Sequence, residues 1–211
     1  YNDLSENPLM SDRGVEEIQQ IIDQTGVKVE TICADCLMEA PLHSNDGAIV
    51  ERSSHVMERL LESGCQLGVK DIVIPCVDQS SLKGQIAEDL FVKNLKPFLE
   101  KAENNKINLS LETDLSPHPF AEILDRFDSD RVTVNYDIGN SASLGFDPVE
   151  ELRCYGDKIT DIHIKDRVLG GGPVELGTGD AHFDLFFKEL VKFDYNRPFI
   201  MQAYRDEEGI E

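Results

Sequence analysis

Basic residues are scarce in this sequence relative to acidic ones. Lys and Arg number 20 against 41 Asp and Glu, which gives a formal net charge of −21 over 211 residues. The summed field of such a chain repels phosphate backbones and anionic lipid surfaces, so we expect neither a nucleic-acid nor a membrane partner. An anionic substrate would need a local pocket of Lys, Arg or backbone N–H groups to oppose that field.

Long apolar runs and an even number of cysteines are also lacking. No run approaches the roughly 18 apolar residues of a membrane span, and no signal peptide is recognisable, so we expect a cytoplasmic protein. Among the five cysteines, Cys33 and Cys36 match the C-x-x-C spacing of redox and zinc sites. A redox pair belongs at a helix N-terminus, whereas this one lies in a strand-like run over residues 29–37. We therefore interpret this pair as buried packing residues, with a redox or zinc site as the minor alternative.

Hydrophobic periodicity alternates between helix-like and strand-like segments along the chain. With 40% hydrophobic residues, the length fits one α/β domain over residues 1–211. Strands are predicted at residues 27–37, 71–77, 107–113, 132–138, 159–165 and 198–204, and helices at 13–25, 48–64, 81–104, 118–127, 148–154 and 183–193. This order predicts a parallel sheet, either open or closed as a barrel. No G-x-G-x-x-G motif follows the first strand, so a dinucleotide-binding sheet lacks its signature.

The predicted strand at residues 159–165 has polar side chains where a buried strand is normally apolar. Alternation places Asp161, His163 and Lys165 on one face. A strand of this kind lines a site, because the imidazole can bind a metal or a substrate oxygen and the ammonium lies one step nearer the strand's end. A surface strand with a half-exposed His is the alternative interpretation.

Polar residues also stand near the C-terminal ends of three other predicted strands. They are Glu112, Asp137 and Gln202, which join His163 as one polar residue per strand. In a closed parallel barrel these ends converge on one mouth, which favours the barrel over the open sheet. Two carboxylates, an imidazole and an amide oxygen suit a divalent ion, Mn²⁺ or Mg²⁺ better than Zn²⁺ or Co²⁺. Each residue alone could instead be a satisfied structural polar group.

Four segments carry a more specific signal. Leu111-Glu112-Thr113, Tyr136-Asp137-Ile-Gly-Asn140, His163-Ile-Lys-Asp166 and Gly177-Thr-Gly-Asp180 resemble motifs of the sugar isomerase and epimerase family with a xylose-isomerase-like TIM barrel. The resemblance covers roughly residues 14–205. It implies a (β/α)8 barrel that acts on a small polyol, keto sugar or sugar phosphate. The family has eight strands and six are predicted, so we expect the first two strands, before Tyr1, and the final helix, after Glu211, to be missing from this chain.

The resemblance also implies a ligand set and a mechanism. In the family a Glu, an Asp, a His and a second Glu bind one divalent metal; Glu112, Asp137 and His163 match the first three, and Gln202 takes the fourth place. An amide can offer its oxygen to a metal but cannot accept a proton, so the usual pair of carboxylate bases is incomplete. Glu112 is then the first candidate for the base that forms an enediolate. Lys165 is the second candidate, and a structural ion pair is its alternative role.

Substrate-binding candidates come from loops that follow the predicted strands. Arg167, the run Gly170-Gly-Gly172 and Arg205 could hold an anionic group, for which a flexible lid with solvated arginines is the alternative. Asn140 stands where the family often places a polar substrate contact, and His43 either reaches the mouth from an earlier loop or lies on the surface. We expect a small carbohydrate substrate, and a homo-oligomer stays open.

Three functions remain open on these grounds. The first is a metal-dependent isomerase or epimerase of a keto sugar or sugar phosphate, and the second is a dehydratase of a keto-polyol, which starts from the same enediolate. The third is a non-catalytic sugar-binding homologue, because Gln202 replaces the usual Glu. The related barrel of endonuclease IV needs more His ligands and a basic DNA-binding face, which the net charge of −21 argues against.

Overall fold

The computed structural model describes residues 4–202 of the chain. Its strands are β1 (Thr31–Cys33), β2 (Asp71–Cys76), β3 (Asn108–Thr113), β4 (Val132–Asp137), β5 (Ile159–Ile164), β6 (Asp166–Arg167), β7 (Pro173–Val174) and β8 (Phe199–Met201). Its helices are α1 (Asp12–Thr25), α2 (Cys36–Glu39), α3 (Gly47–Leu67), α4 (Gln85–Leu95), α5 (Leu99–Asn105), α6 (Pro117–Leu124), α7 (Ile138–Leu144), α8 (Pro148–Tyr155) and α9 (Phe183–Leu190).

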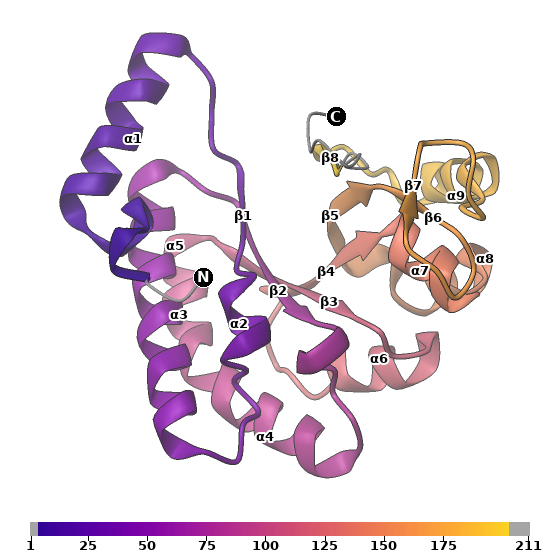
Figure 1. Ribbon diagram of the computed structural model, residues 1–211, viewed down its shortest axis with the longest axis horizontal. Helices are drawn as coiled ribbons and strands as arrows, with labels where there is room; N and C mark the ends of the chain where they lie inside the picture. The colour runs from indigo at the N-terminus through magenta and orange to yellow at the C-terminus, as the bar shows by residue number, and fades with distance from the viewer. Residues whose placement is uncertain (1–3, 203–211) are drawn as a thin grey trace.

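Six of these strands form one parallel sheet in the order β1-β2-β3-β4-β5-β8, and β6 and β7 form a separate antiparallel hairpin. Figure 1 shows the sheet curling, with α1, α3 and α4 along its first half and α6, α8 and α9 along its second. The prediction of a parallel α/β sheet that curls as a barrel wall is confirmed, with six strands in the part of the chain that the structure describes. β1 and β8 are the two edges of that wall.

Buried apolar side chains fill the space between the sheet and its helices. Ile72, Leu109 and Ile162 from the strands are fully buried, in one cluster with Leu61 of α3 and Phe186 of α9. Because side chains alternate along a strand, the polar residues between these apolar ones turn to the inner face of the curled sheet. Among residues 4–202, no helix is both long enough and apolar enough to cross a membrane.

Local capping explains where α1 begins and ends. The Ser11 hydroxyl accepts a hydrogen bond from the Gly14 N–H at 3.1 Å, which satisfies one of the free donors of the first turn. The helix ends at Gly26, whose φ of 73° favours a residue without a Cβ. These signals are local in sequence, so the predicted helix at residues 13–25 is confirmed and starts one residue earlier than expected.

The predicted strand at residues 27–37 is wrong in length. Pairing with β2 covers only three residues and stops at Cys33, after which the chain turns and α2 begins at Cys36. The two cysteines therefore do not share a strand, and both are free thiols. Cys33 is exposed and Cys36 is partly buried, so the interpretation of this pair as buried packing residues is wrong for Cys33.

Other departures have local causes. The predicted helix at residues 81–104 is divided, because Pro97 lies in a 3₁₀ turn between α4 and α5 and cannot donate a helical hydrogen bond. The sequence does not predict α7, which follows β4 directly: the Asp137 carboxylate accepts from the Asn140 N–H at 2.8 Å and caps the new helix. The β6–β7 hairpin is not predicted either, since two-residue strands have no periodicity. Residues 203 and 204 of the last predicted strand lie outside the described residues.

The inner face of the sheet carries a group of polar residues near the N-terminal ends of the strands. The hydroxyls of Ser110, Thr133 and Thr160 lie 2.7–2.8 Å from one another. One oxygen of Asp71, Oδ1, accepts from Ser110, Thr160 and the amide of Asn108 at 2.5–2.9 Å. We call these five residues the Asp71 cluster. Glu112 lies two residues after Ser110 in β3, on the same face of the sheet.

Candidate functional site

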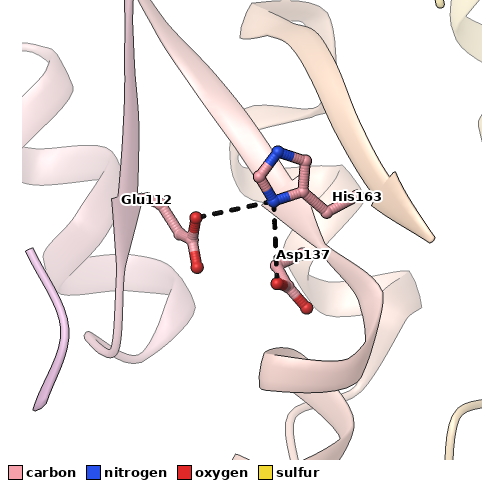
Figure 2. Close-up of side chains that lie close together, drawn as sticks. All are labelled: Glu112, Asp137 and His163. Atoms are coloured by element: carbon pink, nitrogen blue, oxygen red, sulfur yellow. Dashed lines mark ion pairs between the residues drawn. The ribbon is translucent and has the colours of Figure 1, made fainter. Parts of the chain in front are cut away.

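Three side chains meet near the C-terminal ends of β3, β4 and β5. Glu112, Asp137 and His163, here called the Glu112 cluster, offer ligand atoms that all lie within 4.8 Å of one another. His163 Nδ1 is 3.8 Å from Glu112 Oε2 and 3.8 Å from Asp137 Oδ2. Figure 2 shows this ring nitrogen facing both carboxylates. The three residues are 7%, 5% and 2% exposed, so the cluster is buried.

The sheet register brings these residues together. Asp137 ends β4 and is the pairing partner of His163 in β5, while Glu112 stands one residue before the end of β3. A slip of one residue would turn any of them to the outer face, so the apolar pattern that fixes the register also fixes the cluster. The structure thus gathers three of the four predicted ligands, and their roles remain predictions.

Asn135 completes the cluster and was missed by the sequence reasoning. Its amide Nδ2 donates to Glu112 Oε2 at 2.9 Å and lies 3.2 Å from His163 Nδ1. A donor facing Nδ1 is compatible with a neutral ring whose lone pair points into the cluster. The available signal was its position two residues before Asp137, which puts both side chains on the same face of β4.

Lys165 and Gln202 form a second layer beside the cluster. The Lys165 ammonium lies 2.8 Å from Asp137 Oδ2 and donates to Gln202 Oε1 at 2.8 Å. The amide oxygen of Gln202 is therefore directed at Lys165 in this structure. Its predicted role as a fourth metal ligand stays a prediction, and so does the role of Lys165 as an acid or base. The ion pair that was the alternative for Lys165 is present.

Burial and mutual charge shift the proton affinities of the cluster. Burial, followed by the nearby charge of Asp137, raises the pKa of Glu112 to about 7. Burial also acts to raise the pKa of Asp137, but His163 and the Lys165 ammonium outweigh it and hold that pKa below its ordinary value. Burial acts to lower the pKa of His163, and the two carboxylates overcome it and raise the pKa. Of the two carboxyl groups, Glu112 is therefore the one whose pKa lies closer to neutral in the ion-free cluster.

The donor set of this cluster fits a divalent cation. Two carboxylates and one imidazole nitrogen are ligands that Mn²⁺, Mg²⁺, Zn²⁺ and Co²⁺ accept. Asp137 Oδ2 is a buried oxygen whose nearest partner is the Lys165 ammonium, 2.8 Å away, with His163 Nδ1 at 3.8 Å. Buried oxygens of this kind are normally paired. Glu112, Asp137 and His163 are the residues that would hold such an ion.

The predicted substrate-binding residues have separate positions. Asn140 and Arg167 adjoin the cluster: the Asn140 amide donates to Glu112 Oε1 at 2.6 Å, and the Arg167 guanidinium donates to Asn140 Oδ1 at 2.8 Å. His43 packs against Phe91 of α4, with ring centroids 6.4 Å apart. Arg205 lies outside the described residues. None of these four roles is tested by the placement alone.

Comparisons with known proteins agree with this fold. The chain is 26% identical over 200 residues to SgbU of Escherichia coli strain K12, covering 87% of this chain and 68% of that protein. It is 23% identical over 194 residues to the L-ribulose-5-phosphate 3-epimerase UlaE of Escherichia coli O1:K1, covering 88% and 68%.

Two solved structures have the same fold. The 3-keto-D-glucoside 4-epimerase YcjR from E. coli, in its apo form, matches with a TM-score of 0.74 at 17% identity, over 95% of this chain and 81% of that one. A xylose isomerase-like TIM barrel protein from Mycobacterium smegmatis, in complex with magnesium, matches with a TM-score of 0.73 at 19% identity, over 93% and 73%.

The family comparison covers nearly the whole chain. Residues 2–211 match the family described as xylose isomerase-like TIM barrel. This agrees with the curled parallel sheet and with the four motifs in the sequence. The predicted family is therefore confirmed: the chain belongs to the xylose isomerase-like TIM barrel family.

Proposed function

We propose that this protein is a divalent-metal-dependent epimerase or isomerase of a small keto sugar or sugar phosphate. The observation that carries the proposal is the buried Glu112 cluster, in which two carboxylates and an imidazole converge with ligand atoms within 4.8 Å of one another. A relative named L-ribulose-5-phosphate 3-epimerase supports a phosphorylated keto pentose as the first substrate to try. Mn²⁺ and Mg²⁺ are the preferred ions, with Zn²⁺ and Co²⁺ as alternatives.

Glu112 is the proposed base. An ion bound by the cluster would supply positive charge beside the substrate's carbonyl and hydroxyl oxygens and so acidify the neighbouring C–H group. Glu112 takes that proton, and the bonding electron pair becomes the carbon–carbon double bond of an enediolate. Without an ion, the pKa of Glu112 is raised to about 7 by burial and by Asp137; a bound divalent cation would lower it and so keep Glu112 ionised and able to accept the proton.

Lys165 is the proposed second acid or base. Its ammonium is placed by Asp137 on one side and by Gln202 on the other. Returning a proton to the opposite face of the enediolate carbon inverts that carbon, and both groups recover their starting protonation states by exchange with water. Asn140 and Arg167 are proposed substrate contacts, and His43 and Arg205 are retained as candidates.

Deuterium incorporation tests this function. The chain is incubated with Mn²⁺ and L-ribulose 5-phosphate in deuterated water, and the products are followed by NMR. We expect the 3-epimer with solvent deuterium at the inverted carbon, and we expect Glu112→Gln to slow its formation about 1000-fold. An unsaturated product would identify the dehydratase instead.

One observation favours the non-catalytic alternative. The side chain at the place of the family's second Glu is an amide, and its oxygen is engaged by Lys165 rather than directed at the cluster. A sugar-binding homologue would bind Mn²⁺ and sugar without turnover, and Gln202→Glu would then create activity. Turnover by the unmodified chain excludes this alternative.

A further inference from the structure

A buried carboxylate organises the loop between β5 and α9. Asp166 is 1% exposed, and its side chain accepts hydrogen bonds from the backbone N–H groups of Gly177, Gly179 and Ala181 at 2.9–3.1 Å. A Cβ at Gly179 would come within 2.3 Å of the Asp166 carboxylate, so a larger residue there would push the loop away. These hydrogen bonds hold the loop around Asp166, so the backbone that carries Arg167 has a fixed position.

Arg167 is held by this loop and points at Asn140. Its Nε and Nη2 donate to the Gly171 carbonyl at 3.1 and 2.8 Å, and its Nη1 donates to Asn140 Oδ1 at 2.8 Å. A guanidinium can only donate, so it fixes which end of the Asn140 amide faces it. If the amide were reversed, its NH₂ group would face the guanidinium and its oxygen would face the carboxylate of Glu112.

The orientation of the Asn140 amide determines which of its atoms faces Glu112. With its oxygen on Arg167, its Nδ2 donates to Glu112 Oε1 at 2.6 Å, while the Asn135 amide donates to Oε2 at 2.9 Å. Each oxygen of Glu112 therefore has one amide donor. One donor, Asn135, comes from the sheet itself, and the other depends on the loop through Arg167.

We propose that Arg167 is a positioning residue: by fixing the sense of the Asn140 amide, it holds Glu112 in the orientation that the cluster needs. This role rests on the proposed function, because the orientation matters for metal binding and proton transfer. It also gives the loop between β5 and α9 a role other than binding substrate. Groups that orient metal ligands from behind affect metal affinity by roughly 10–100-fold when they are removed.

The first test uses the metal-free, ¹⁵N-labelled protein and does not depend on activity. The side-chain amide signal of Asn140 is identified by its loss in Asn140→Ala. We expect slow solvent exchange of this amide in the unmodified protein and fast exchange in Arg167→Met. Arg153→Met makes the same chemical change on the exposed side of α8 and is the matched control, with no effect expected. Slow exchange that persists in Arg167→Met overturns the proposal.

The second test is a double-variant cycle on Mn²⁺ affinity without substrate. Arg167→Met and Asn140→Ala should each weaken binding about 10-fold. The double variant should weaken it by the same factor, because both changes break one chain of contacts. A loss of about 100-fold in the double variant would mean independent effects and would overturn the proposal.

Two further results keep the tests distinct. Arg167→Leu also removes every donor at this position but has a different shape, so it provides a second measurement of the amide if Arg167→Met fails to fold; fast exchange is again expected, and persistent slow exchange again overturns the proposal. If the unmodified protein binds no divalent ion, the proposed function fails, and the amide exchange alone decides the positioning role.

Discussion

The two ends of the sheet's inner face both hold buried carboxylates, but in opposite conditions. In the Asp71 cluster, one carboxylate oxygen receives three donors at 2.5–2.9 Å, and the guanidinium of Arg197 lies 3.7 Å from the other. In the Glu112 cluster, two carboxylates and one imidazole have ligand atoms within 4.8 Å of one another, and the Lys165 ammonium lies 2.8 Å from Asp137 Oδ2. In the first group, neutral donors surround one oxygen of a single carboxylate. In the second, two carboxylates and an imidazole face one point, which makes it the candidate site.

The largest expected effect is a loss of turnover when a residue of the Glu112 cluster is replaced. Glu112→Gln removes the proposed base with little change in volume, so turnover should fall about 1000-fold while the protein remains folded. Steady-state kinetics with Mn²⁺ and the keto sugar phosphate measure it, and a thermal melt checks folding. Glu122→Gln, on an exposed position of α6, is the matched control. Retained turnover in Glu112→Gln would remove Glu112 from the mechanism.

The next largest effect is a loss of stability when Asp71 of the Asp71 cluster is replaced. Asp71→Ala leaves the donors of Asn108, Ser110 and Thr160 without their buried acceptor, which should lower the free energy of unfolding by about 3 kcal/mol. Urea unfolding measures it, and Asp128→Ala at an exposed position is the control. Mn²⁺ affinity should not change. A stable Asp71→Ala protein with weakened Mn²⁺ binding would erase the contrast between the two ends.

The smallest effect concerns pH. The pKa of Glu112 is raised to about 7, so the folded protein holds this proton more tightly than the unfolded chain does. Its contribution to stability is therefore complete below the unfolded pKa of 4.5 and is lost as the pH rises through about 7.

This loss is measured against a variant that cannot ionise at this position. With a chelator present, the difference in unfolding free energy between Glu112→Gln and the unmodified protein should move in favour of the variant by on the order of 2 kcal/mol between about pH 5 and about pH 8. Urea unfolding at several pH values gives this difference. Parallel pH curves for the two proteins would contradict the raised pKa.

Local sequence signals account for what could be predicted. Glu112 and His163 each lie one residue before the end of a strand whose other face is apolar. Period-two alternation and the order of the strands were therefore enough to predict that both side chains lie on the inner face near the strand ends. Asn135 was missed because an amide within a strand has no signature of its own. α7 was missed because it is short and starts on Asp137, which the sequence reasoning used only as a ligand.

Contacts between distant segments account for what could not be predicted. The link from Arg167 through Asn140 to Glu112 joins three separate segments of the chain. Glu112 lies near the end of β3, and Asn140 and Arg167 come after predicted strands, which suggested substrate binding for these two. No local pattern indicates that the three residues bind one another. The direction of the Gln202 amide toward Lys165 is a tertiary detail of the same kind.

The strand order has a consequence for motion. Within residues 4–202, β1 and β8 each have a neighbour on one side only, whereas β3, β4 and β5, which carry the Glu112 cluster, are hydrogen-bonded on both sides. Edge strands fray more readily than central ones, so amide protons should exchange with water first in β1 and β8 and last in β3 and β4. Fluctuations that open the rim of the sheet therefore leave the geometry around Glu112 and Asp137 undisturbed.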